Sequence, residues 1–154
     1  MIIQAKPDPW PKQLAEVLHP VPGSSRLMEL EEPFPVVYCS KGTWWRFWLT
    51  PPWRYDVASV PRLFWLFVSP FELGFEPPGS HDWLIEHEGV VLVDRWSLNY
   101  EEWVNEFDYT HMTRRAVDAF LAMKMREKEI PKLKRRAAYC LVRNWSLMKG
   151  ADWV

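Results

Sequence analysis

Proline limits, more than any other residue, what this chain can fold into. The 154 residues include 14 prolines, and each one fixes its own backbone and ends a helix that has already begun. The first 25 residues carry Pro7, Pro9, Pro11, Pro20 and Pro22. This spacing leaves only Gln13–Leu18 for a turn or two of helix. We therefore predict a Pro-rich N-terminal arm over residues 1–25 that packs on the body of the protein.

Two aromatic runs after the arm are typical of β-strands. They are Pro35–Cys39 and Thr43–Leu49, joined by Ser40-Lys41-Gly42. β-Branched and aromatic residues favour a pleated surface, and a short connection with glycine favours a hairpin. The tryptophans of the second run most simply pack under helices. A platform for carbohydrate or peptide is the alternative interpretation.

The overall charge gives no electrostatic reason to expect a charged partner. The formal net charge is −1 and the pI is about 6.4, so binding to nucleic acid or to an anionic membrane is not expected. No window approaches the roughly 18 apolar residues of a membrane helix. Cys39 and Cys140 lie far apart in apolar stretches, which predicts two buried free thiols in a reducing cytoplasm.

The second half of the chain is dominated by helical patterns. Residues 90–93 are interpreted as a short strand, and residues 96–109 as a polar, aromatic connection with a turn of helix near Glu101–Val104. Apolar residues then recur at three- and four-residue spacing from Thr110 or Thr113 to about Glu129.

A last helix is expected from Pro131 to about Met148. Its predicted buried face comprises Leu133, Ala137, Cys140, Leu141 and Trp145. Together these patterns predict one α+β domain over residues 26–154, in which a small antiparallel sheet built on the Trp-rich hairpin packs against about four helices.

Most of the candidate chemistry lies between Asp56 and His87. Ser59, followed by Val60 and Pro61, is typical of a helix start, and Ser80 can cap a second helix from His81 to about His87. Asp56 is either a turn residue or a carboxylate aimed into a cleft. His81 is either a structural hydrogen-bonding residue or a catalyst.

A metal site on the second helix alone is not expected. Metal ligands on one face of a helix stand at i and i+4, and the residue four positions after His81 is Ile85. Any metal site would therefore need ligands from several elements.

Four motifs follow one another along the chain: Asp56-Val-Ala-Ser-Val-Pro-Arg62 with Phe64-Trp65; His81-Asp82-Trp83-Leu84; Arg114 or Arg115 with Asp118 and Phe120; and Tyr139, Val142-Arg143 and Trp145. In this order they resemble the DUF1353 family of phage and prophage proteins. The resemblance covers about residues 50–146. Val57 stands where the family usually has glycine, and Ile85 where it usually has tyrosine.

The resemblance implies a phage context and a site where distant polar residues meet. Asp56, His81, Asp82 and Asp118 are the candidates for catalysis. An imidazole flanked by carboxylates is a workable general base, and His81, Asp82 and Asp118 could also bind a divalent metal. The supporting residues would be Ser59, Arg62, Arg114, Arg115 and Arg143. Either chemistry suits a hydrolase that acts on cell-wall material during phage entry or lysis.

Two non-enzymatic functions compete with this hypothesis. In the first, the protein is a virion structural protein of the tail or tail tip, and it contacts other phage structural proteins or a second copy of itself through the N-terminal arm. In the second, it is a small phage factor that binds a host protein. In each case the protein is made in the host cytoplasm, and in the first it is carried into the virion.

Overall fold

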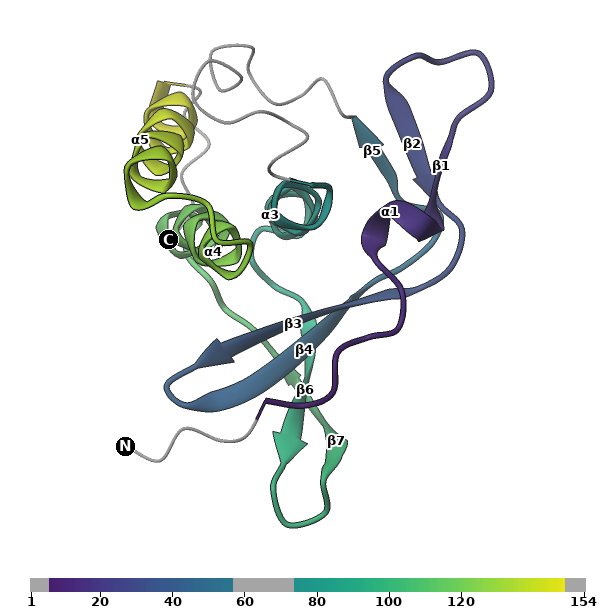
Figure 1. Cartoon of the computed structure of the whole chain (residues 1–154), viewed down its shortest axis with the longest axis vertical. Coiled ribbons are helices and arrows are strands. Elements are labelled where there is room, and N and C mark those ends of the chain that lie inside the picture. The colour runs from purple at the N-terminus through teal and green to yellow at the C-terminus, as the bar shows by residue number, and fades with distance from the viewer. Residues whose placement is uncertain (1–5, 57–73, 149–154) are drawn as a thin grey trace.

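The structure is a computed structural model that describes residues 6–56 and 74–148. It confirms the α+β class, with two antiparallel sheets and a group of helices (Figure 1). One sheet has the order β1-β2-β5, and the other the order β3-β4-β6-β7. The strands are β1 Leu18–Pro20, β2 Leu27–Leu30, β3 Phe34–Ser40, β4 Thr43–Leu49, β5 Arg54–Asp56, β6 Leu92–Ser97 and β7 Glu102–Tyr109. The helices are α1 Leu14–Val17, α3 Glu76–Glu86, α4 Arg114–Glu127 and α5 Lys132–Met148.

The predicted Trp-rich hairpin is confirmed as β3 and β4. The two strands pair in register from Phe34 with Leu49 to Ser40 with Thr43. Lys41 and Gly42 form the turn, and both have positive φ angles, of 51° and 80°, as a two-residue hairpin turn requires. Alternate residues of β4 face opposite sides of the sheet.

One face of the hairpin packs into the main hydrophobic core. Phe47 and Leu49 of β4 are fully buried, and Phe47 contacts the rings of Tyr38 and Phe120 at centroid distances of 6.1 and 6.0 Å. Because Phe120 belongs to α4, this aromatic contact joins the sheet to the helices. The helices cover the inner face of the four-stranded sheet (Figure 1).

The prediction of a connection over residues 96–109 was wrong. This segment is the second half of a hairpin in which β6 and β7 pair from Leu92 with Tyr109 to Ser97 with Glu102. The predicted helical turn at Glu101–Val104 is absent from this described segment, and Glu101 instead has a φ of +52° beside the start of β7. A shift of register between Val93 and Asp94 interrupts the alternation that identifies a strand in a sequence.

The N-terminal segment is built into the domain more closely than an arm would be. Leu14, Val17 and Leu18 belong to the main core cluster, and β1 pairs with β2. The structure therefore does not confirm a separate Pro-rich arm, and the boundary at residue 25 stays a prediction.

The helix limits differ from the predicted ones at two places. α3 begins at Glu76 rather than at His81, because Pro77 and Pro78 suit a first helical turn. The predicted cap at Ser80 was wrong, since Ser80 lies inside α3 and its Oγ donates to the Glu76 carbonyl at 2.6 Å. By contrast, Thr113 caps α4 as predicted, accepting from the Ala116 amide at 3.2 Å. The helix predicted to start at Ser59 falls outside the described residues.

The predicted buried face of α5 was wrong at Leu133 and Cys140, whereas Leu141 packs against the second core as predicted and the side chain of Trp145 falls outside the described residues. Leu133 is 81% exposed, and Cys140 is exposed as well, whereas Ala138 is fully buried. Both cysteines are free, as predicted, but Cys39 is only half-buried. α5 packs on α4 in a small second core of Leu121, Met125, Ile130 and Ala138, so only a narrow stripe of the helix is covered. None of the described helices has the length and the apolar run needed to cross a membrane.

Candidate functional site

His81 lies at the centre of a buried polar cluster, as the motif order implied. The imidazole Nε2 stands 3.1 Å from Asp118 Oδ1, and Nδ1 stands 3.4 Å from Asp82 Oδ1. His81 and Asp82 come from α3, and Asp118 from α4. The pairing therefore joins these two helices. His81 and Asp118 are 37 residues apart in the chain.

Two arginines complete the cluster around Asp118. Arg114 Nε donates to Asp118 Oδ1 at 3.2 Å, one turn earlier on α4, and Arg143 Nη1 of α5 lies 3.4 Å from Oδ2. Asp118 has no exposed surface, and only 5% of Arg114 is exposed. A buried carboxylate must be paired to be tolerated, and here it holds together α3, α4 and α5. We call these five residues the His81 cluster: His81, Asp82, Arg114, Asp118 and Arg143.

The electrostatics of the cluster favour a charged imidazole. Burial lowers the pKa of His81, but the hydrogen bonds and negative charges of Asp118 and Asp82 outweigh it, and the net pKa is raised above 6.5. When the ring is charged, both its nitrogens carry protons and donate to the two carboxylates. His81 then has no lone pair with which to act as a base.

The remaining predicted site residues lie apart from the cluster or outside the described chain. Asp56 is at the end of β5, where its Oδ2 accepts from Arg26 Nη2 at 2.8 Å. Asp56 and Asp82 both act on Tyr55: burial raises the pKa of Tyr55, and the charges of Asp82 and Asp56 raise it further. Arg115 is exposed, so Arg114 is the arginine that the motif brings to Asp118. Ser59 and Arg62 fall outside the described residues.

The cluster is a poor fit to a divalent metal. Over residues 6–56 and 74–148, no three His, Cys, Asp or Glu side chains are placed to hold a metal ion together. Asp118 already has cationic groups on both carboxylate oxygens, and a metal would have to displace them. The geometry therefore gives no support to the metal hypothesis.

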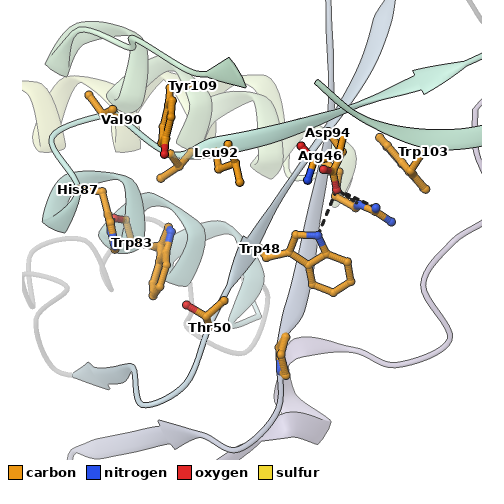
Figure 2. A pocket seen from close by; sticks show the side chains of 13 residues that line it. Arg46, Trp48, Thr50, Trp83, His87, Val90, Leu92, Asp94, Trp103 and Tyr109 are labelled. Atoms are coloured by element: carbon orange, nitrogen blue, oxygen red, sulfur yellow. Dashed lines mark hydrogen bonds and ion pairs between the residues drawn. The ribbon is translucent and has the colours of Figure 1, made fainter. Parts of the chain in front are cut away.

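An open groove, which sequence reasoning did not identify as a site, lies on the outer face of the four-stranded sheet. Its volume is about 670 Å³, within the range of about 300–1,000 Å³ that is usual for small-molecule sites. Strands β4, β6 and β7 form its floor, and the end of α3 forms a wall (Figure 2). We call it the aromatic groove, after the aromatic side chains in its lining: Trp48, Trp83, His87, Trp103 and Tyr109.

A buried ion pair lies on the floor of the aromatic groove. Arg46 on β4 and Asp94 on β6 are register partners, and the Arg46 Nη2 atom is 2.7 Å from Asp94 Oδ2. The same oxygen accepts from Arg46 Nε at 2.9 Å and from Trp48 Nε1 at 3.2 Å. The guanidinium also lies 4.8 Å from the Trp48 ring centroid and 4.5 Å from that of Trp103. These contacts make the floor rigid and compensate its charges.

The wall of the groove holds a polar atom with no partner. Trp83 is 7% exposed, and its indole Nε1 is buried without a hydrogen bond in the described structure. The ring itself is fixed, because it stacks on His87 at 4.2 Å and meets Trp53 edge-on at 5.6 Å. Figure 2 shows the indole nitrogen on the side of Leu92 and Tyr109, toward the groove. A buried donor left unpaired costs about 1–3 kcal/mol, so this group needs an explanation.

The sequence contained a partial signal for this groove. The platform interpretation of the tryptophans concerned β4, and of those tryptophans Trp48 lines the groove. Trp83 belongs to the His81-Asp82-Trp83-Leu84 motif, and Trp103 and Tyr109 lie in the segment predicted as a connection.

Fold and site together define a small α+β protein with a closed ionic cluster inside and an open aromatic groove outside. A family model described as "Protein of unknown function (DUF1353)" matches residues 28–142, well over half of the chain. The chain therefore belongs to the DUF1353 family. Neither the search of curated proteins nor the search of solved structures found a match.

Proposed function

We propose that this protein binds bacterial cell-wall material through the aromatic groove and does not hydrolyse it. The observation that carries the proposal is the contrast between the two sites. The groove is open and has an unpaired buried donor at Trp83, whereas the His81 cluster has its nitrogens and its Asp118 oxygens already paired.

The burial of the His81 cluster supports a structural role for it. A general base must come within hydrogen-bond reach of the proton that it removes, and His81 is 5% exposed with a carboxylate facing each ring nitrogen. The cluster instead joins three helices. In this proposal, its charges hold the helices that carry the Trp83 wall of the groove.

The setting that we propose is a phage particle or the lysis machinery. The support is the resemblance of the ordered motifs to phage and prophage proteins. A protein of the tail or tail tip that held cell-wall material would act during attachment or entry. Detection of the chain at a fixed copy number in purified particles supports the particle setting, and its consistent absence from particles removes it.

The test of binding without hydrolysis is a sedimentation assay. Purified protein is mixed with purified bacterial cell walls, and both the pelleted protein and the soluble wall fragments are measured. We expect the protein in the pellet and no fragments beyond those of a protein-free control. Absence of the protein from the pellet would overturn the proposal, as would release of fragments that depends on His81.

A hydrolase is the second candidate, and one observation favours it. The side chain of Asp82 is 28% exposed while it contacts His81 Nδ1 at 3.4 Å, so it is a carboxylate of the cluster that solvent reaches. In this second candidate, the Asp82 carboxylate is held by the charged His81 imidazole and contacts the substrate. Release of wall fragments by the wild type, and its loss in Asp82→Asn, would support this candidate over the first.

A further inference from the structure

We infer that the ligand of the aromatic groove is a neutral saccharide, such as the glycan part of the cell wall. This inference rests on the proposed function and deepens it by assigning the class of ligand. It draws on the polar groups, the aromatic walls and the position of the groove on the sheet.

The buried side chains of the groove leave one donor and one acceptor for a ligand. The donor is Trp83 Nε1, which has no hydrogen-bond partner among the described residues. The acceptor is Asp94 Oδ1, because the contacts of Asp94 in the described chain all go to Oδ2. Asp94 is 7% exposed. A sugar ring that carries hydroxyl and acetamido groups offers an acceptor to Trp83 Nε1 and a donor to Asp94 Oδ1.

The charge of the groove favours a ligand without net charge. Arg46 and Asp94 neutralise each other on the floor, and the guanidinium is enclosed by Trp48 and Trp103. An anionic or cationic ligand would lose its hydration there without gaining a free counter-charge. A neutral ring with many hydroxyl groups loses much less hydration free energy when it enters the groove.

The rim of the groove offers exposed apolar surface to the faces of such a ring. Tyr109 is 53% exposed, Val90 41% and Leu92 40%. Tyr109 extends its hydroxyl end toward Trp83 (Figure 2), so it presents both a flat ring and a polar tip to the same space. Exposed aromatic and aliphatic side chains beside buried polar groups are usual in ligand sites.

The position of the groove on the face of the sheet argues against an extended peptide. A peptide that binds to a sheet gains most from main-chain hydrogen bonds to an edge strand. Here β4 and β6 are interior strands that pair with each other at Arg46 and Asp94, on the floor itself, and among the floor strands β7 alone lies at an edge of the described sheet. A ligand on this face meets side chains, which suits a ring with hydroxyl groups.

The experiment is a competition in the cell-wall sedimentation assay. A short oligomer of N-acetylglucosamine and a cell-wall stem peptide are added separately, and direct binding of the oligomer is measured by calorimetry. We expect the oligomer to displace the protein from the walls and the peptide not to do so.

Two variants and one control locate the site. Trp83→Phe removes the unpaired donor but keeps an aromatic ring, and we expect it to weaken oligomer binding by about three- to tenfold, as the loss of one hydrogen bond predicts. Tyr109→Ala should weaken it at least as much. Tyr100→Ala is the matched control, because Tyr100 is 73% exposed and lies in the turn before β7, outside the groove, so it should bind like the wild type.

The outcomes separate this inference from the proposed function. In one outcome the peptide, and not the oligomer, releases the bound protein from the walls. That result would overturn the saccharide inference and leave the proposed function standing. Oligomer binding that Trp83→Phe and Tyr109→Ala leave unchanged would overturn the assignment to the groove. Absence of wall binding by the wild type would overturn both. A Trp83→Phe variant that melts like the wild type excludes misfolding as the cause of its weaker binding.

Discussion

At the scale of single residues, Arg114 and Arg115 show how burial decides the role of a charge. The two are neighbours on α4, yet Arg114 is 5% exposed and bound to Asp118, while Arg115 points to solvent. Removing one partner of a buried ion pair leaves the other charge uncompensated.

We predict that Arg114→Ala lowers the free energy of unfolding by about 3 kcal/mol and that Arg115→Ala changes it by less than about 0.5 kcal/mol. Urea denaturation of the two variants beside the wild type measures both. Equal effects of the two substitutions would mean that the cluster adds no more stability than an ordinary helix surface.

His81 makes stability depend on pH. Its pKa in the folded protein is raised above 6.5 by Asp118 and Asp82, against the opposing effect of burial. The charged imidazole therefore stabilises the folded protein. This stabilisation is fully present when the pH is below the pKa of His81 in the unfolded chain, and it is lost as the pH rises through the higher pKa of the folded protein. Arg114 and Arg143 face Asp118 and stay charged throughout this range.

The predicted outcome is that the wild type loses stability relative to His81→Asn as the pH rises from about 6.5 into the alkaline range. Urea unfolding of both proteins over that range gives the difference. Titration of the His81 ring by NMR tests the same point without a variant. A ring that titrates below the ordinary histidine value would contradict it.

At the scale of elements, the β3–β4 hairpin was correctly predicted, but its turn is not built from the best residues. Lys41 has a φ of +51°, a conformation that costs most residues about 1–2 kcal/mol and that asparagine tolerates better. Asn-Gly is the favoured pair for such a turn, and Gly42 already occupies the second position.

We therefore expect Lys41→Asn to raise the free energy of unfolding by about 0.5–1 kcal/mol. Gly42→Ala is the opposite control and should lower it, since Gly42 has a φ of +80°. Thermal and urea unfolding measure both changes. A Lys41→Asn variant less stable than the wild type would show that the lysine side chain has a role of its own.

At the scale of the whole molecule, a single buried lysine connects the helices to the sheet. Lys124 on α4 is 3% exposed. Its Nζ donates to the Val37 carbonyl of β3 at 3.0 Å and pairs with Glu76 of α3 at 2.8 Å and with Glu127 at 2.7 Å. Its neighbours Arg126 and Glu127 on α4 are exposed, so the burial of Lys124 follows from the packing of α4 on β3 and α3.

Lys124→Ala is predicted to cost about 3 kcal/mol of unfolding free energy, because it removes the closer and buried cation beside Glu76 and the side-chain donor to the Val37 carbonyl. Lys128→Ala is the control: Lys128 lies 3.7 Å from the same Glu76, but its side chain is 42% exposed, and its loss should cost less than about 1 kcal/mol. Similar costs for the two lysines, measured by urea unfolding, would contradict the role given to Lys124.

The sequence by itself determined the features that depend on neighbouring residues. Alternating aromatic residues and a glycine turn identified the β3–β4 hairpin, periodic apolar residues and Thr113 identified α4, and ordered motifs identified the family. Such features follow from local propensity and spacing, which act within a few residues. The same local signals failed for β6–β7, where a register shift interrupts the alternation.

Only the tertiary structure decided which side chains meet and which are buried. His81 and Asp118 are 37 residues apart, and Lys124 and Val37 are 87 apart, so nothing in their local sequence fixes the contact. The same holds for the aromatic groove, whose walls come from α3, β4, β6 and β7. Burial is a property of what surrounds a residue after folding. For that reason Leu133 is exposed on α5 while Asp118 has no exposed surface.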